Sequence, residues 1–212
     1  MAPQERRPTL LHTHSLAMKF SVSELTAMIK ERRTIYPKDY SPRVVQRELI
    51  EQVLGNAVWA PNHGMTQPWR FQVFTGAARE QLSNFMGQEY TRITPEEKFL
   101  QKKLDSHVQR PRQSTVVIAL CMARDAKGKI SELEEMFAVA CGVQNMFLTC
   151  TAHGLGAFWS TGAVITGPGM RSFLGLGESD RCLGLFYIGY PAIEWPKGYR
   201  KPLNEFVRWV EE

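Results

Sequence analysis

A short run of apolar residues in the middle of the chain constrains the fold most strongly. Residues 115 to 121 read Thr-Val-Val-Ile-Ala-Leu-Cys, without a charge or a turn former. Because successive side chains of a strand point to opposite faces, an unbroken apolar run requires cover on both faces of its sheet. The run therefore predicts a central strand enclosed between two layers of helices.

A long helix is expected directly after this strand. Ser131 and Glu134 form a capping box, and the helical pattern continues to about His153, with Gly154 at its exit. The middle of the helix, Met136 to Val143, is apolar almost all round. A helix with that pattern is buried, either in the core or in a subunit interface.

Two helices are expected nearer the N-terminus. A capping box at Ser21 opens a helix that we expect to bury Leu25, Met28 and Ile29. The pair Ser41-Pro42, a capping serine before a proline, predicts the start of the second.

The remaining pattern mixes strands and helices. Three further strands are predicted at Trp69 to Thr75, Leu155 to Thr161 and Cys182 to Gly189, and residues 77–87 and 88–112 predict helices. Since the elements do not alternate strictly as strand and helix, the pattern favours an α+β fold in three layers.

The length and composition fit one soluble domain. We expect it to span residues 20–212, behind a flexible polar arm at 1–19, and no apolar run approaches the roughly 20 residues of a membrane span. The net charge of +5 fits an anionic ligand such as a phosphate, although it also fits plain solubility. The basic residues are scattered and no zinc-finger or RNA-recognition signature is present, which argues against nucleic acid.

The cysteines and histidines indicate neither disulfides nor a metal site. The four cysteines form no C-x-x-C pair, which is typical of reduced core residues in a cytoplasmic protein. His12 and His14 lack a second ligand cluster, so we assign no metal.

The stretch from Trp59 to Phe71 is the richest in binding chemistry. It holds two indoles, one imidazole, one arginine and two amides, shaped by Pro61, Gly64 and Pro68. Apolar faces beside hydrogen-bonding groups suit a flat heteroaromatic ligand. A well-packed corner between a helix and a strand explains the stretch equally well.

Motifs of covalent and phosphoryl catalysis are missing from the sequence. It contains no G-x-S-x-G elbow, no Walker A loop and no H-E-x-x-H. If the chain is an enzyme, a bound cofactor is therefore expected to carry the chemistry.

Three separated pieces of sequence share one resemblance. Arg32-Arg33-Thr34, the stretch with Ala60-Pro61 and Gln67-Pro68-Trp69, and Gly154-x-Gly156-x-x-Trp159-Ser160-Thr161-Gly162 follow in this order. Together they resemble the nitroreductase family of flavin mononucleotide (FMN) enzymes, in its compact branch with an A-P-x-H loop. The resemblance covers roughly Ser21 to Val210. It implies a three-layer fold with a mostly antiparallel central sheet, in an intertwined homodimer with the flavin sites at its interface.

The resemblance also implies a reaction and a set of cofactor contacts. Hydride would pass from NADH or NADPH to the flavin and then to a nitroaromatic, a quinone or a similar acceptor, in a ping-pong cycle, with no side chain assigned as catalytic. The C-terminal arm, residues 195–212, would pack on the partner subunit. The implied contacts are Arg32, Arg33 and Thr34 at the phosphate and ribityl chain, Trp59 and His63 from the partner's loop, Trp159, Ser160 and Thr161 beside the isoalloxazine, and Arg200 and Lys201 as a second phosphate contact.

Each of these residues also has a purely structural interpretation. The paired arginines could be solvated charge at a helix end, His63 a loop histidine, and Ser160 with Thr161 polar groups at a strand end. The chain departs from the family at Tyr36, where many members carry a lysine or arginine. Arg70 is a candidate for the missing charge, or else a solvent-facing strand residue.

A second departure is Met65, which stands where the family commonly has an asparagine. A flavin-binding or storage protein with little turnover therefore remains the alternative.

Overall fold

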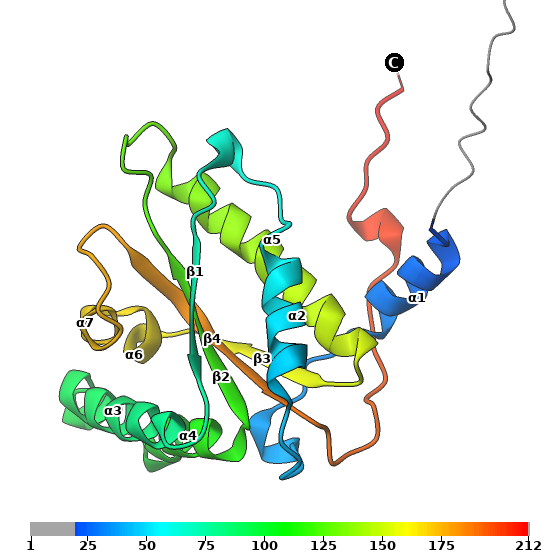
Figure 1. The fold of residues 1–212 in the computed structure, drawn as a ribbon. Helices are drawn as coiled ribbons and strands as arrows, with labels where there is room; N and C mark the ends of the chain where they lie inside the picture. Colours follow the sequence, from blue (N-terminus) through cyan, green and yellow to red (C-terminus); the bar gives the residue numbers. More distant parts are fainter. Residues whose placement is uncertain (1–19, 212) are drawn as a thin grey trace, which may run out of the picture.

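The structure, a computed structural model, describes residues 20–211, and the expectations for the arm 1–19 and for His12 and His14 lie outside them. Its centre is a four-stranded sheet in the order β1-β2-β4-β3, in which every neighbouring pair is antiparallel (Figure 1). The strands are β1 (Trp69–Phe74), β2 (Val116–Met122), β3 (Gly156–Ser160) and β4 (Arg181–Gly189). The predicted central strand is confirmed, because every residue of β2 is buried.

Helices cover both faces of this sheet (Figure 1). The helices are α1 (Val22–Glu31), α2 (Arg47–Ala57), α3 (Ala78–Ile93), α4 (Gln101–Gln113), α5 (Glu132–Ala152), α6 (Ala163–Thr166) and α7 (Pro168–Phe173). Ile118 and Leu120 of β2 join the core under α2 and α5, whereas Val117 and Ala119 join the core under α3, α6 and α7. The three-layer α+β prediction is thus confirmed, and the alternation along β2 is what divides the two cores.

Two of the three predicted capping signals are present in the structure, those of Ser21 and Ser131. The Ser21 hydroxyl accepts the amide of Glu24 at the start of α1, at 3.3 Å. Ser131 and Glu134 form the full capping box of α5, which ends at Ala152 with His153 as its C-cap. Helix α5 therefore has the bounds that the sequence predicts.

The start of the second helix was predicted wrongly. Helix α2 begins at Arg47, after an extended segment in which the Ser41 amide donates to the Tyr190 carbonyl at 2.8 Å. Tyr40 and Pro191 form an antiparallel bridge beside it. The chain that follows β4 thus satisfies the backbone of residues 40–41, and the local helix signal of Ser41-Pro42 is overridden.

The expected burial of α1 is also wrong within one protomer, whereas the middle of α5 is buried in the core on one face, and burial of its other face in a subunit interface stays a prediction. No residue of α1 is buried, and Leu25 and Ile29 are each about half exposed. Helix α5 buries one face but exposes Leu133 and Phe137, which lie one turn apart. An apolar helix surface in contact with water marks an interaction surface.

The C-terminal arm projects from the body beside α1 (Figure 1). The indole of Trp195 donates to the Glu31 carbonyl at 2.7 Å and ties the arm to the end of α1. Beyond it, Leu203–Glu205 forms a short 3-10 turn. Within residues 20–211, no helix is long and apolar enough to cross a membrane.

Candidate functional site

Three arginines gather where α1 ends. Arg32 follows the last residue of the helix, and its guanidinium lies 5.2 Å from the centre of the Phe147 ring on α5. Burial lowers the pKa of Arg32, and the nearby charges of Arg200 and Arg33 lower it further. Among the described residues, none of these three arginines takes part in an ion pair with a carboxylate. A dianion such as a phosphate would offset this repulsion, so the cluster fits an anionic group.

Arg33 differs from its neighbours because its donors are already used. Its Nε donates to the Pro196 carbonyl at 2.7 Å, and one terminal nitrogen donates to the carbonyls of Lys30 and Arg32 at 2.6 and 2.9 Å. Gly198 packs so closely on the guanidinium that a Cβ there would lie 2.4 Å from it. Arg33 therefore fastens the C-terminal arm to the end of α1, which leaves Arg32 and Arg200 as the freer cations.

The chain after the arginines is fixed against strand β3. The Ile35 amide donates to the Ala157 carbonyl at 3.1 Å, and Ile35 itself is buried. Gly156 permits this contact, because a Cβ at that position would lie 2.8 Å from Ile35 and 2.9 Å from the Tyr40 ring. The backbone thus holds Thr34, which is exposed, next to the strand that carries Trp159 and Ser160.

The three residues at the end of β3 do not point the same way. Trp159 packs toward the core under α5, and its indole nitrogen donates to the Leu183 carbonyl at 3.3 Å. Ser160 is buried on the opposite face, where its hydroxyl accepts from Arg110 at 3.3 Å. Thr161 is exposed in the turn that follows. Only the backbone and Thr161 are therefore free to meet a ligand in the way that the sequence predicts.

The loop with the predicted aromatic ligand site lies against the start of α5. His63 Nδ1 lies 2.8 Å from a carboxylate oxygen of Glu134. Gly64 has a positive φ of 60° and packs against Ile130, which a Cβ would approach to 3.2 Å. Trp69 is buried, as expected for core packing, whereas Trp59 is 86% exposed.

The loop and the arginines lie at opposite ends of one helix. His63 contacts Glu134 in the first turn of α5, and Arg32 lies over Phe147 near its end. Glu134 and Phe147 are thirteen positions apart, which corresponds to about 20 Å along a helix, at 1.5 Å per residue. Within one chain, the structure therefore does not bring His63 beside Arg32.

Arg110 is a cation that sequence reasoning missed. It comes from α4 and lies 5.2 Å from the centre of the Phe158 ring, which in turn contacts the ring of Tyr36 at 4.8 Å. Arg110 thus supplies a positive charge close to the position where the family's usual cation is replaced by tyrosine. Arg70, the candidate named from sequence, instead donates to the carbonyls of Gln67 and Trp69 on the opposite edge strand.

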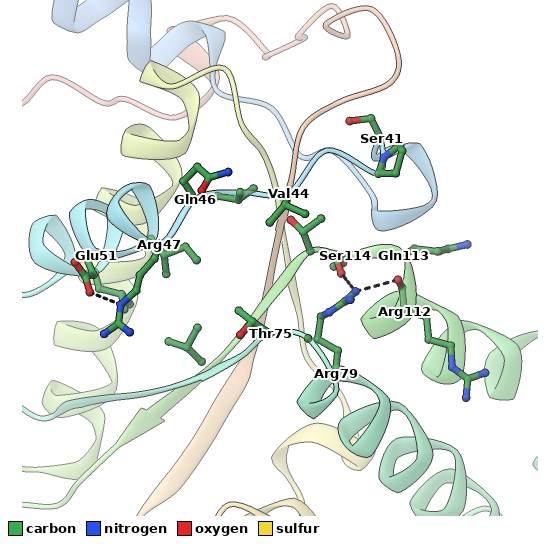
Figure 2. Close-up of a pocket in the computed structure, with 17 residues that line it drawn as sticks. Ser41, Val44, Gln46, Arg47, Glu51, Thr75, Arg79, Arg112, Gln113 and Ser114 are labelled. Carbon is green, nitrogen blue, oxygen red and sulfur yellow. Dashed lines mark hydrogen bonds and ion pairs between the residues drawn. The ribbon is translucent and has the colours of Figure 1, made fainter.

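A cavity of about 970 Å³ lies at the β1 edge of the sheet, away from β3 (Figure 2). It opens between the start of α2 and the end of β1, with Val44, Ile50 and Val73 among its apolar lining. Arg79 donates there to backbone carbonyls of residues 111–114, and Arg47 pairs with Glu51 at 2.7 Å. Its cations are thus engaged, and no predicted cofactor residue lines it.

The fold and the basic cluster define a three-layer α+β protein that can hold an anionic group at the β3 edge of its sheet. Residues 29–190 match the model of the nitroreductase family, and the chain belongs to that family.

Individual relatives agree with this assignment. YdjA of Escherichia coli (strain K12), provisionally named an NAD(P)H nitroreductase, is 29% identical over 147 residues, which are 69% of this chain and 78% of YdjA. The structure of a nitroreductase-like protein from Bacillus cereus is 28% identical, covers 92% of this chain and 100% of its own, and superimposes with a TM-score of 0.77. The FMN-dependent nitroreductase NfnB of Mycobacterium smegmatis, solved with NADPH, is 20% identical and has a TM-score of 0.69, over 89% of this chain and 99% of its own.

Proposed function

We propose that this protein is an FMN-dependent NAD(P)H oxidoreductase. The observation that carries the proposal is the convergence of Arg32 and Arg200 beside the β3 edge, without a carboxylate partner in the described chain. Family membership and the names of the relatives support the choice of FMN as the anion-bearing cofactor. The four free cysteines fit a reducing, cytoplasmic setting.

Different residues of the site would bind different parts of the cofactor. Arg32 and Arg200 would hold the phosphate, with Thr34 toward the ribityl chain, whereas Lys201 already pairs with Glu205 at 2.7 Å. The end of β3, from Trp159 to Thr161, would support one side of the ring system. Bound FMN supplies the redox chemistry, since it can accept a hydride from a nicotinamide and pass electrons to a nitroaromatic, a quinone or a similar acceptor.

A homodimer would complete this site. His63 contacts Glu134 at the start of α5, close to the exposed side chains of Leu133 and Phe137, and Trp59 is itself exposed. Packing two copies along α5 would cover Leu133 and Phe137, and would bring the partner subunit's loop toward the arginines. Burial of a contiguous apolar surface is the driving force for such an assembly.

Anaerobic titration with NADH and with NADPH tests the proposed activity. We expect the purified protein to be yellow, to lose its flavin absorbance on addition of one of the two nicotinamides, and to regain it on addition of a nitroaromatic or a quinone. A flavin that binds but is reduced by neither nicotinamide would favour the storage protein instead. Protein that binds no FMN would refute both functions.

The cavity at the β1 edge, drawn in Figure 2, forms a groove that suits the partner's C-terminal arm. The arm exposes Phe206, Trp209 and Val210, each by at least 70%, and these are residues that favour strands. Strand β1 ends the sheet, so its outer edge has no strand partner among residues 20–211. We infer that the arm of one subunit adds to the β1 edge of the other and fills the groove beside Val73.

Truncation after Pro202 is expected to weaken the dimer at least tenfold, because burial of even one large apolar side chain contributes about 1.5–3 kcal/mol. Sedimentation equilibrium of the full chain and of the truncated chain measures the change. The variant Val73→Glu, which places a charge in the groove, is expected to weaken the dimer in the same direction. If both variants dimerise like the full chain, the arm does not occupy this groove.

A further inference from the structure

A second pocket, of about 360 Å³, lies between α4 and the turn that follows β3. We call it the α4 pocket. Thr161 and Gly162 form its side toward β3, and Tyr90, Ile93 and Val164 contribute apolar surface. Because Thr161 belongs to the proposed flavin wall, a molecule in this pocket would lie next to the cofactor.

Helix α4 presents a row of basic side chains to this pocket. Lys103, His107 and Arg110 all line it and are spaced four and three residues apart, so they share one face of the helix. No carboxylate side chain of the described residues lines the pocket, and none of the three basic residues takes part in an ion pair there. The pocket thus combines an apolar wall with uncompensated positive charge.

The pKa of His107 reflects burial as well as this positive charge. Burial, followed by the charges of Arg110 and Lys103, lowers the pKa of His107 to about 4. Its Nδ1 is enclosed and has no hydrogen-bond partner in residues 20–211, while its ring contacts Tyr90 at a centroid distance of 5.2 Å. The imidazole is therefore neutral near pH 7, and the two neighbouring cations carry the attraction for an anion.

Contacts with Ser160 and Phe158 hold the guanidinium of Arg110 in position. It donates to the buried hydroxyl of Ser160 at 3.3 Å and lies over the Phe158 ring. The described chain provides no other hydrogen bond to its guanidinium, which leaves donors for a ligand. A planar guanidinium with free donors matches the geometry of a carboxylate.

We propose that the α4 pocket binds the carboxylate of an aromatic acid, and that the preferred electron acceptors of this protein are anionic aromatic compounds. The apolar wall would take the ring, and Lys103 and Arg110 would take the charge. The inference rests on the proposed oxidoreductase function, since it places the acceptor beside the flavin. The volume suits one substituted benzene ring but not a whole dinucleotide, and this favours the acceptor over the nicotinamide as occupant.

A matched pair of acceptors tests the proposal in the FMN-loaded protein. 4-Nitrobenzoate and 4-nitrobenzamide have similar shape and differ in charge. We expect kcat/KM to be about tenfold or more higher for the benzoate, as for one charge-assisted contact, and to fall with added salt. Equal values for the two acceptors would overturn the proposal.

Substitutions on α4 locate the effect. Lys103→Gln and Arg110→Gln are each expected to remove most of the preference for benzoate, measured as the ratio of kcat/KM for the benzoate to kcat/KM for the amide. Lys102→Gln is the matched control, because Lys102 is the neighbouring lysine and lines a different pocket. A loss of preference in the control as large as that in Lys103→Gln would mean that the general charge of α4 acts, and not the α4 pocket.

Binding without turnover separates this proposal from the proposed function. Calorimetric titration of the oxidised protein with benzoate is expected to show one site, weakened about tenfold or more by Lys103→Gln. Bound carboxylate should also raise the pKa of His107, measured by NMR with the His107→Gln variant for assignment. If benzoate binds but no nicotinamide reduces the flavin, the proposed function fails and the anion site stands. If reduction occurs but benzoate does not bind, or if Lys103→Gln raises the KM for NADPH and leaves benzoate binding unchanged, the anion site fails.

Discussion

Replacing Arg32 by alanine is expected to weaken FMN binding by about 1.5–3 kcal/mol, the usual loss for a hydrogen bond to a charged group. This corresponds to a rise in Kd of roughly tenfold to a hundredfold. Arg32 lies over the Phe147 ring and is partly buried beside two further arginines. A phosphate placed there gains from partial desolvation as well as from charge, which makes Arg32 the strongest anchor of the cluster.

Comparison of FMN with riboflavin isolates the phosphate. Riboflavin lacks the phosphate, so Arg32→Ala should change its affinity little, and flavin fluorescence on titration of the apoprotein measures both ligands. Arg47→Ala is the control, because that arginine is exposed and pairs only with Glu51 at the start of α2. Equal losses for FMN and riboflavin would contradict the assignment of Arg32 to the phosphate.

Arg33 should behave differently from Arg32, although the two are neighbours. Its guanidinium donates to three backbone carbonyls and holds the C-terminal arm against α1. The sequence pattern predicted the pair as one phosphate site, since a spacing cannot show which arginine has free donors. Only the fold, which brings Pro196 to residue 33, separates the two roles.

The parts of the fold that were predicted correctly depend on local patterns. The seven apolar residues of β2, Val116–Met122, require cover on both sides, and Ser131 with Glu134 caps α5 through contacts within one turn. The start of α2 was missed because its competitor is distant in sequence, where Tyr190 accepts the Ser41 amide. Such tertiary contacts override the local helix propensity of a segment.

In the candidate site, too, local motifs could be predicted from the sequence, whereas contacts between distant residues could not. The arginines and the end of β3 were found as motifs, but Arg110 was not, because no motif marks it and it meets Ser160 across fifty residues. The exposure of α1 was also hidden, since an amphipathic pattern does not tell which molecule covers the apolar face.

Replacing Arg124 by alanine is expected to cause the largest loss of stability, about 3–5 kcal/mol, because it leaves a buried carboxylate without its counter-ion. That carboxylate is Glu135 on α5, which is 1% exposed. It pairs with Arg124 and also accepts the Asp125 amide at 2.8 Å. Arg124 further donates to the Ile130 carbonyl at 3.0 Å, so the pair closes the turn between β2 and α5.

Chemical denaturation of Arg124→Ala, compared with two further variants, checks this expectation. Arg112→Ala removes a more exposed pair with Glu80 and should cost no more than about 1 kcal/mol. The double variant Arg124→Met with Glu135→Leu should recover part of the loss, since apolar residues of similar volume can replace a buried pair. If Arg124→Ala costs no more than Arg112→Ala, the pair does not hold the turn.

The same pair supports the loop that begins at Trp59. Gly64 packs on Ile130, whose carbonyl Arg124 holds, and His63 contacts Glu134, the neighbour of Glu135 in sequence. Loss of Arg124 should therefore release the loop as well as the turn. In the proposed dimer this loop belongs to the partner's flavin site, so the folded fraction of Arg124→Ala should bind FMN more weakly than the intact protein does. Unchanged FMN affinity at full occupancy of the folded state would show that the loop is not part of the flavin site.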